Sequence, residues 1–194
     1  MGHPKRKLFL LIFLCLFSLR AFSALMVGTL NPPLKKIQVD DEGNTSSYAL
    51  DPFIGYQYDM GAFWWNHQFQ PEAGIVYHQV DVSEEYNKFS LYLLYDFSWP
   101  LTSSFKVLYG LGNFVTWIVG GGGTVVKNNG LSTYTFYKPD GSSFSFNTST
   151  NLGLEFQATD KLSLLGKALM FDLLHTKKRT FRYLVSLKYS LGGY

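Results

Sequence analysis

The sequence predicts an all-β protein: an eight-stranded antiparallel up-and-down transmembrane β-barrel with one long loop. Most segments alternate large apolar residues with polar or small ones, and this period of two is typical of a strand with one apolar and one polar face. No segment has a convincing helical pattern that could cover such a sheet. Charged residues make up only 16% of the 194 residues, against about 25% in an ordinary soluble domain. The length fits one domain.

Residues 1–23 are predicted to be a cleaved secretory signal peptide. A basic segment at 5–7 precedes an apolar run at 8–19, and small residues follow at the two positions that a signal peptidase reads, so we expect cleavage before Ala24. The alternative, a membrane-spanning anchor, would need about 20 apolar residues, and Arg20 ends this run too early.

Removal of the signal changes the chemistry of the chain. Cys15 is the only cysteine and leaves with the signal, so the mature protein has no thiol for a disulfide or a metal site. The signal also carries four basic residues and no acid, which turns the formal net charge from +3 to −1. No basic patch remains to indicate a nucleic-acid partner. The mature chain, 24–194, is expected to be one barrel domain, with the barrel proper at 33–194.

The strands are expected in the following order. Residues 24–33 form an irregular leader, and a weakly patterned first strand follows from Leu34 to Asp41. From Tyr48 the alternation becomes clear, and it predicts strands at 48–58, 68–79, 88–98, 105–119, 147–157, 162–174 and 181–191. In the last of these, from Phe181 to Leu191, every second residue is large and apolar, and Leu184 is the one apolar residue of the other set.

The connections alternate in character. Those at 59–67, 100–104 and 159–161 are short or moderate, whereas those at 41–47, 81–87, 120–146 and 175–180 are more polar. In an up-and-down meander every second connection lies at the same end, so one end should carry tight turns and the other elaborated loops. The longest loop, Gly120 to Phe146, contains four consecutive glycines and a Pro-Asp-Gly-Ser turn at 139–142, which favours a hairpin projecting above the barrel.

These features together resemble small bacterial outer-membrane β-barrel proteins of the OmpA-like, eight-stranded class, over roughly Tyr48 to Leu191. The resemblance implies a Gram-negative outer membrane as the location, with membrane lipid and lipopolysaccharide as surroundings. It also implies that the barrel-assembly machinery recognises Phe181 to Leu191. Tyr194 departs from the pattern because it is out of phase with the apolar face, so either the signal ends at Leu191 or the glycines before Tyr194 form a bulge.

The polar residues of each strand share one face, and the charged residues among them should point into the barrel. Eight strands leave an interior that side chains just fill, so we interpret these charges as a structural network of ion pairs and hydrogen bonds that replaces a hydrophobic core. The alternative is a narrow polar path for ions or solutes. The charged residues concerned are Asp51, Glu72, Asp96, Lys106, Glu155, Lys167, Arg182 and Lys188.

The long loop supplies the main functional hypothesis, which is a structural or surface-interaction role. Exposed aromatic residues are favourable anchors in interfaces, although the same residues could pack the loop on itself or sit at the membrane rim. A small pore is one alternative function, and a soluble secreted barrel that binds an apolar ligand on an inverted, inward apolar face is another. The candidate interaction residues are Tyr134, Phe136, Tyr137, Phe144 and Phe146.

An enzyme is not predicted, although some barrels of this size modify lipids. His78 lies near Ser83, Glu84 and Glu85 at a predicted strand end, but their spacing fixes no geometry for an activated nucleophile. The set of His67, Ser98 and Asp172 fits no better. The sequence contains no metal-ligand pattern, P-loop or dinucleotide fingerprint, so no cofactor is expected.

Overall fold

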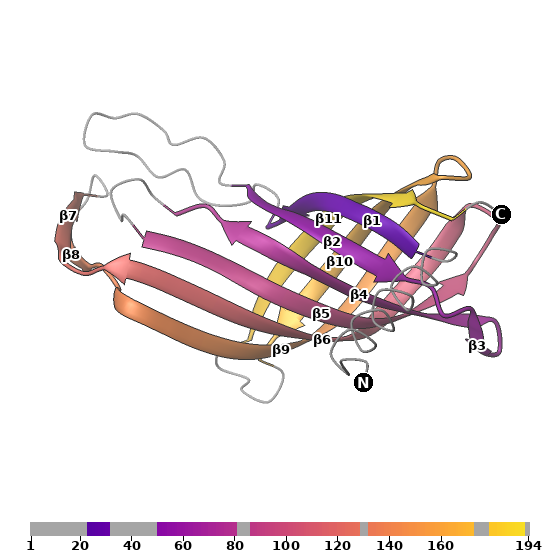
Figure 1. Cartoon of the computed structure of the whole chain (residues 1–194), viewed down its shortest axis with the longest axis horizontal. Helices are drawn as coiled ribbons and strands as arrows, with labels where there is room; N and C mark the ends of the chain where they lie inside the picture. The colour runs from indigo at the N-terminus through magenta and orange to yellow at the C-terminus, as the bar shows by residue number, and fades with distance from the viewer. Residues whose placement is uncertain (1–22, 32–49, 81–85, 129–131, 173–178, 193–194) are drawn as a thin grey trace, which may run out of the picture.

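The chain forms a closed antiparallel β-barrel, as the prediction required. The computed structural model describes residues 23–31, 50–80, 86–128, 132–172 and 179–192. Neighbouring strands pair in sequence order, and β1 pairs with both β2 and β11, which closes the barrel (Figure 1). The strands of the barrel are β1 (Ser23–Leu30), β2 (Asp51–Tyr58), β4 (His67–His78), β5 (Tyr86–Pro100), β6 (Phe105–Gly121), β9 (Asp140–Gln157), β10 (Leu162–Phe171) and β11 (Thr180–Ser190).

The position of the first strand corrects the prediction. Residues 24–33 were expected to be an irregular leader, but β1 begins at Ser23 and ends at Leu30. The alternation was hidden because both faces of β1 are apolar, with Leu25 turned outward and Met26 buried in the barrel. The predicted first strand at 34–41 lies outside the described residues, as do Tyr194 and residues 1–22 of the predicted signal peptide. The last residue of that predicted signal, Ser23, is the first residue of β1.

The two ends of the barrel differ as the spacing predicted. One end, called here the turn end, carries the short connections at 101–104 and 158–161 and the short strand β3 (Ala62–Trp64). The start of β1 and the end of β11 meet there, because the backbone N–H of Leu191 donates to the carbonyl oxygen of Ser23 at 2.8 Å. The opposite end, called the loop end, carries the hairpin of β7 (Thr124–Asn128) and β8 (Thr133–Tyr137), at the left of Figure 1.

The predicted loop 120–146 is mostly strand. β6 and β9 remain paired up to Gly121 and Asp140, and the hairpin is β7–β8 rather than the Pro-Asp-Gly-Ser segment at 139–142. Gly141 has a positive φ of 73° but lies opposite Gly120 inside the ladder. The Ser-Phe alternation from 143 to 146 continues the period of β9 beyond the barrel wall, so Phe144 and Phe146 belong to a strand.

The faces of the strands have the predicted orientation. Leu187 is 48% exposed on the outer surface, whereas its neighbour Lys188 is 7% exposed and points inward. This arrangement contradicts the soluble alternative, in which the apolar face would form the core. The interior is nevertheless not a purely polar network, because a cluster of apolar side chains fills it between the charges. Its members are Met26, Leu30, Phe53, Val76, Tyr92, Leu94, Leu108, Phe114, Leu165, Leu169, Phe171 and Leu184.

Gly74 makes room for one of these side chains. A Cβ at Gly74 would lie 2.5 Å from the carbonyl oxygen of Ile54 on β2 and 2.7 Å from two ring carbons of Tyr92 across the β4–β5 ladder. We expect Gly74→Ala to lower the free energy of unfolding by about 1–3 kcal/mol, because overpacking forces a filled interior apart. The measurement is urea unfolding in detergent micelles. Gly166→Ala is the matched control, since a Cβ there would meet nothing within 4 Å; an equal loss in both variants would contradict the packing argument.

Candidate functional site in the barrel interior

The middle of the barrel holds a lysine between two carboxylates. Lys167 Nζ lies 2.5 Å from Glu72 Oε2 and 2.6 Å from Asp96 Oδ2, and all three side chains are fully buried. The Tyr92 hydroxyl donates to Glu72 Oε1 at 2.8 Å, and Asn151 Nδ2 donates to Asp96 Oδ1 at 2.8 Å. Charges buried in this way are tolerated only when they are paired and hydrogen-bonded.

A second charged group lies nearer the turn end. Lys188 Nζ is 2.7 Å from Glu155 Oε1, and both side chains are buried. Lys106 is the register partner of Glu155 on the neighbouring strand β6. The remaining predicted interior charge, Arg182, is half-buried towards the loop end, where its guanidinium lies 5.3 Å from the centre of the Phe171 ring.

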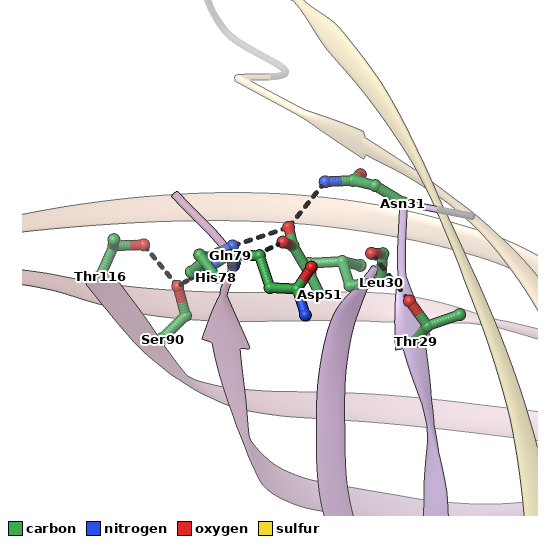
Figure 2. A network of polar contacts seen from close by, with 8 residues as sticks. All are labelled: Thr29, Leu30, Asn31, Asp51, His78, Gln79, Ser90 and Thr116. Carbon is green, nitrogen blue, oxygen red and sulfur yellow. Dashed lines mark hydrogen bonds and ion pairs between the residues drawn. The ribbon is translucent and has the colours of Figure 1, made fainter. Parts of the chain in front are cut away.

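The third group, at the loop end, links four strands through one histidine (Figure 2). His78 Nδ1 lies 2.9 Å from Asp51 Oδ2, and His78 Nε2 lies 2.7 Å from Ser90 Oγ. Ser90 Oγ in turn lies 2.7 Å from Thr116 Oγ1. The exposed fractions of Asp51, His78 and Ser90 are 3%, 4% and 2%. We call these four side chains the loop-end relay.

The strand register explains why these residues meet. Asp51 is the first residue of β2 and His78 the last of β4, so both lie at the loop end on the inward parity. Ser90 and Thr116 are direct partners across the β5–β6 ladder. The carboxylate is fixed from two further sides, because the backbone N–H of Gln79 donates to Oδ1 and Asn31 Nδ2 donates to Oδ2, each at 3.1 Å.

The eight predicted interior charges therefore fall into separate layers rather than one network. The structure places Asp51, Glu72, Asp96, Glu155, Lys167 and Lys188 in buried ion pairs or hydrogen bonds, with Lys106 and Arg182 half-buried. Apolar side chains separate the layers. On β10, for example, the inward residues are Ser163, Leu165, Lys167, Leu169 and Phe171, all nearly inaccessible to solvent.

The structure gives His78 partners that the sequence did not indicate. Residues 81–85, which include Ser83, Glu84 and Glu85, lie outside the described residues. The partners that the structure gives His78 are Asp51 and Ser90, which are 27 and 12 residues away in the sequence. The sequence does place all three residues on the inward face near the same end of the barrel. It does not show that His78 contacts Ser90, because that contact is diagonal across β4 and β5 and depends on how far one strand is displaced along the other.

The other histidine set does not come together. His67 lies at the turn end, where its Nδ1 is 2.7 Å from the Tyr109 hydroxyl and its ring stacks on Trp99. The Ser98 hydroxyl donates to Gln68 Oε1 at 3.3 Å. Asp172 follows the last residue of β10, at the loop end, with a positive φ of 56°. These three residues therefore form no catalytic arrangement.

The outer surface carries aromatic residues at two levels. Near the loop end Trp117 contacts Phe89 and stacks on Phe144, with ring centres 4.9 and 5.2 Å away. Near the turn end Trp99 lies beside His67 on the outer surface. Ten residues of β5 separate Phe89 from Trp99, which at about 3.4 Å per residue and a tilt of about 45° gives roughly 24 Å. An apolar band flanked by aromatic girdles, about 25 Å tall, is the surface of an outer-membrane barrel.

The candidate interaction residues fall into two groups. Tyr134, Phe136 and Tyr137 lie on β8, where Tyr137 is 76% exposed and Phe136 is half-buried. Phe144 and Phe146 point outward from β9, on the same face as the membrane-facing residues. Phe144 belongs to the aromatic level near the loop end, where it stacks on Trp117. The second group therefore sits at the membrane rim, which the sequence left as an alternative.

Two features are absent from the part of the chain that the structure describes. No helix in the described ranges is long and apolar enough to cross a membrane. Within the same ranges, no three His, Cys, Asp or Glu side chains are grouped so that they could hold a metal ion.

Comparison with known proteins gives similar folds at low identity. No protein-family model and no curated protein sequence matches the chain. Among solved structures, it is similar to the attachment invasion locus protein Ail of Yersinia pestis, with 10% identity, a TM-score of 0.45 and coverage of 88% of this chain and 98% of that chain. Neisserial surface protein A has 12% identity, a TM-score of 0.46 and coverage of 87% and 94%.

The outer-membrane enzyme PagL is also similar, with 17% identity, a TM-score of 0.38 and coverage of 87% of this chain and 97% of that chain. The strand pairing and the outer surface of this chain are those of a small eight-stranded outer-membrane β-barrel.

Proposed function

We propose that this outer-membrane barrel serves a surface-interaction role, in which a closed barrel anchors a β-arm that contacts a protein on another cell or surface. The arm is the part of β6 and β9 beyond Trp117 and Phe144, together with the β7–β8 hairpin. The observation that carries the proposal is the length of β6 and β9, which have 17 and 18 residues, whereas β10 and β11 have 10 and 11.

The filled interior favours this role over a pore. Polar layers alternate with buried leucines and phenylalanines, so ions entering from either end would meet apolar side chains. Leu94 and Leu108 are both completely buried, and Leu94 lies between Tyr92 and Asp96 on the inner face of β5. Eight strands enclose only enough space for their own side chains. The ion pairs then have a structural role, because they fill the interior and link side chains from different strands.

The chemistry of the arm favours a protein partner. Between Val119 and Ser143 the sequence is rich in glycine, serine, threonine and tyrosine and carries only Lys127, Lys138 and Asp140 as charges. Surfaces of this composition combine rigid aromatic anchors with adaptable hydrogen bonding, as binding loops of antibodies do. A nearly neutral arm also implies binding that added salt weakens little.

Shortening the arm tests the proposal. Gly121 and Asp140 are register partners, so deleting 122–139 and joining them through Asn-Gly, a favoured two-residue hairpin turn, leaves the barrel wall intact. Bacteria displaying the shortened protein should be retained at least tenfold less than wild type on a panel of immobilised host and bacterial surface proteins, because loss of a single aromatic anchor often costs about 2 kcal/mol or more.

Two single substitutions provide the matched control. Tyr137→Ser removes an exposed aromatic ring from the arm, and Tyr189→Ser makes the same change on the outer surface near the turn end. Only the first should lower retention. Heat-modifiable gel migration establishes that each variant is folded, and equal retention of the shortened and wild-type proteins across the panel would refute a binding role for the arm.

A further inference from the structure

We propose that Ser90, His78 and Asp51 of the loop-end relay form a serine-hydrolase site inside the barrel mouth, which takes a carboxylic ester with a small acyl group. Ser90 is the nucleophile, His78 the general base and acid, and Asp51 the residue that positions the imidazole. This activity is independent of the binding role proposed for the arm.

The geometry is that of a nucleophile, a base and an orienting carboxylate in series. Ser90 Oγ lies 2.7 Å from His78 Nε2, and His78 Nδ1 lies 2.9 Å from Asp51 Oδ2. Both distances are within the range of about 2.6–3.2 Å at which such a triad transfers a proton. Three strands supply the three residues, as unrelated folds do when they build the same constellation.

The hydrogen bonds also give the relay a direction. A neutral imidazole that donates from Nδ1 to Asp51 leaves Nε2 as the acceptor for the Ser90 proton. The Thr116 hydroxyl, 2.7 Å from Ser90 Oγ, can then donate to the serine oxygen. In this arrangement every bond has one donor and one acceptor. The tautomer is assigned from these partners.

The relay exceeds what a buried serine needs for stability. Ser98, on the same inward face of β5, is buried and is satisfied by one bond to the side-chain oxygen of Gln68. Ser90 instead contacts an imidazole whose second nitrogen is held by a carboxylate, and that carboxylate is itself held by Asn31 and by the Gln79 backbone. Fixing a side chain through surrounding hydrogen bonds is how catalytic groups are held in position.

The reaction balances without a cofactor. Ser90 Oγ bonds to the ester carbonyl carbon while its proton passes to His78 Nε2. The carbon–oxygen bond to the alcohol then breaks, and His78 returns the proton to the departing oxygen. Water then attacks the acyl carbon while its proton passes to His78 Nε2; the bond between that carbon and Ser90 Oγ breaks, His78 returns the proton to Oγ, and the acid is released. One ester and one water thus become one acid and one alcohol.

The position of the relay limits the substrate. Asp51 and His78 end their strands at the loop end, so the relay lies just inside the mouth of the barrel. Ser90 is only 2% exposed and the interior is filled, so only a small acyl group can reach it. Lys88, the register partner of His78 on β5, is half-buried on the same inward parity as Ser90.

A small serine-directed reagent tests the site. The folded barrel in detergent micelles is treated with methanesulfonyl fluoride, a reagent about as small as an acetyl donor, which forms a bond between the serine oxygen and sulfur and releases fluoride. Mass spectrometry and peptide mapping should find one adduct, on Ser90, formed at least 100-fold faster than any adduct on Ser98. Ser90→Ala should remove it, and His78→Gln should slow it by about 10²-fold or more, the typical contribution of a general base. Hydrolysis of para-nitrophenyl acetate should fall in the same variants.

Each alternative result is decisive. Absence of an adduct on Ser90 in the folded wild-type barrel overturns the proposal, as does labelling of His78→Gln at the wild-type rate. Heat-modifiable migration shows whether a variant has folded. If a variant does not fold, the presence or absence of the Ser90 adduct in the wild-type barrel decides the question. For Asp51, the readout is the proton resonance of His78 Nδ1–H, which should be strongly downfield in wild type and lose that shift in Asp51→Asn. An unchanged resonance would remove Asp51 from the relay.

Discussion

Replacing Lys167 with methionine should lower the free energy of unfolding of the barrel by about 3–5 kcal/mol, the cost of leaving a buried ion pair without one partner. Lys167 lies between Glu72 and Asp96, and none of the three side chains reaches solvent. Methionine fills a similar volume but removes the positive charge. Two carboxylates would then face each other in the interior without a cation between them, although Tyr92 and Asn151 would still donate hydrogen bonds to them.

Urea unfolding in lipid vesicles or detergent micelles measures this loss. Lys161→Met is the matched control, because Lys161 is exposed in the turn between β9 and β10 and its removal should change the free energy of unfolding by less than about 0.5 kcal/mol. Adding Glu72→Gln and Asp96→Asn to Lys167→Met should restore part of the loss, since the uncompensated charges are then gone. A Lys167→Met barrel as stable as wild type would mean that the buried charges do not depend on each other.

An arginine in place of Leu187 or Leu93 should impair insertion into lipid by about 2–4 kcal/mol, the cost of a cation on the lipid face near the middle of the membrane. Both leucines point outward, Leu93 on β5 between Phe89 and Trp99 and Leu187 on β11. Lipid offers no water to solvate the guanidinium, and the filled interior cannot accept it. The expected result is a smaller heat-modifiable, folded fraction in vesicle refolding assays.

Leu101→Arg provides the comparison for this prediction. Leu101 is exposed in the turn after β5, beyond Trp99, where an arginine reaches water and should cost only about 0–1 kcal/mol. If all three arginine variants insert as well as wild type, the outer face between the aromatic levels does not meet lipid.

The outward face could be predicted from the sequence because lipid demands an apolar residue at nearly every exposed position. This demand produced the clear alternation of Phe89, Leu91 and Leu93 on β5. The interior makes no equally simple demand, since Leu94 fills it as well as Ser90 does. Where both faces are apolar the period disappears, and for this reason β1 was missed.

The loop-end relay could not be predicted for a different reason. Parity placed Asp51 and His78 inside the barrel, but the sequence does not state how far one strand is displaced along the next. The contact between Asp51 and His78 spans two neighbouring strands, β2 and β4, and that with Ser90 is diagonal across β4 and β5. Both contacts depend on the stagger of the closed barrel, which is a property of all eight strands together.

The seam between β1 and β11 has a consequence for assembly. Its ladder runs from Ala24 opposite Ser190 to Leu30 opposite Leu184. The first and last strands of the barrel therefore satisfy each other's backbone hydrogen bonds. Until β11 arrives, the free edges of β1 and β10 expose backbone donors and acceptors that hydrocarbon cannot satisfy. The barrel can therefore close in the bilayer only when β11 is present, and a protein truncated before Thr180 would remain an open sheet whose unpaired edges favour aggregation.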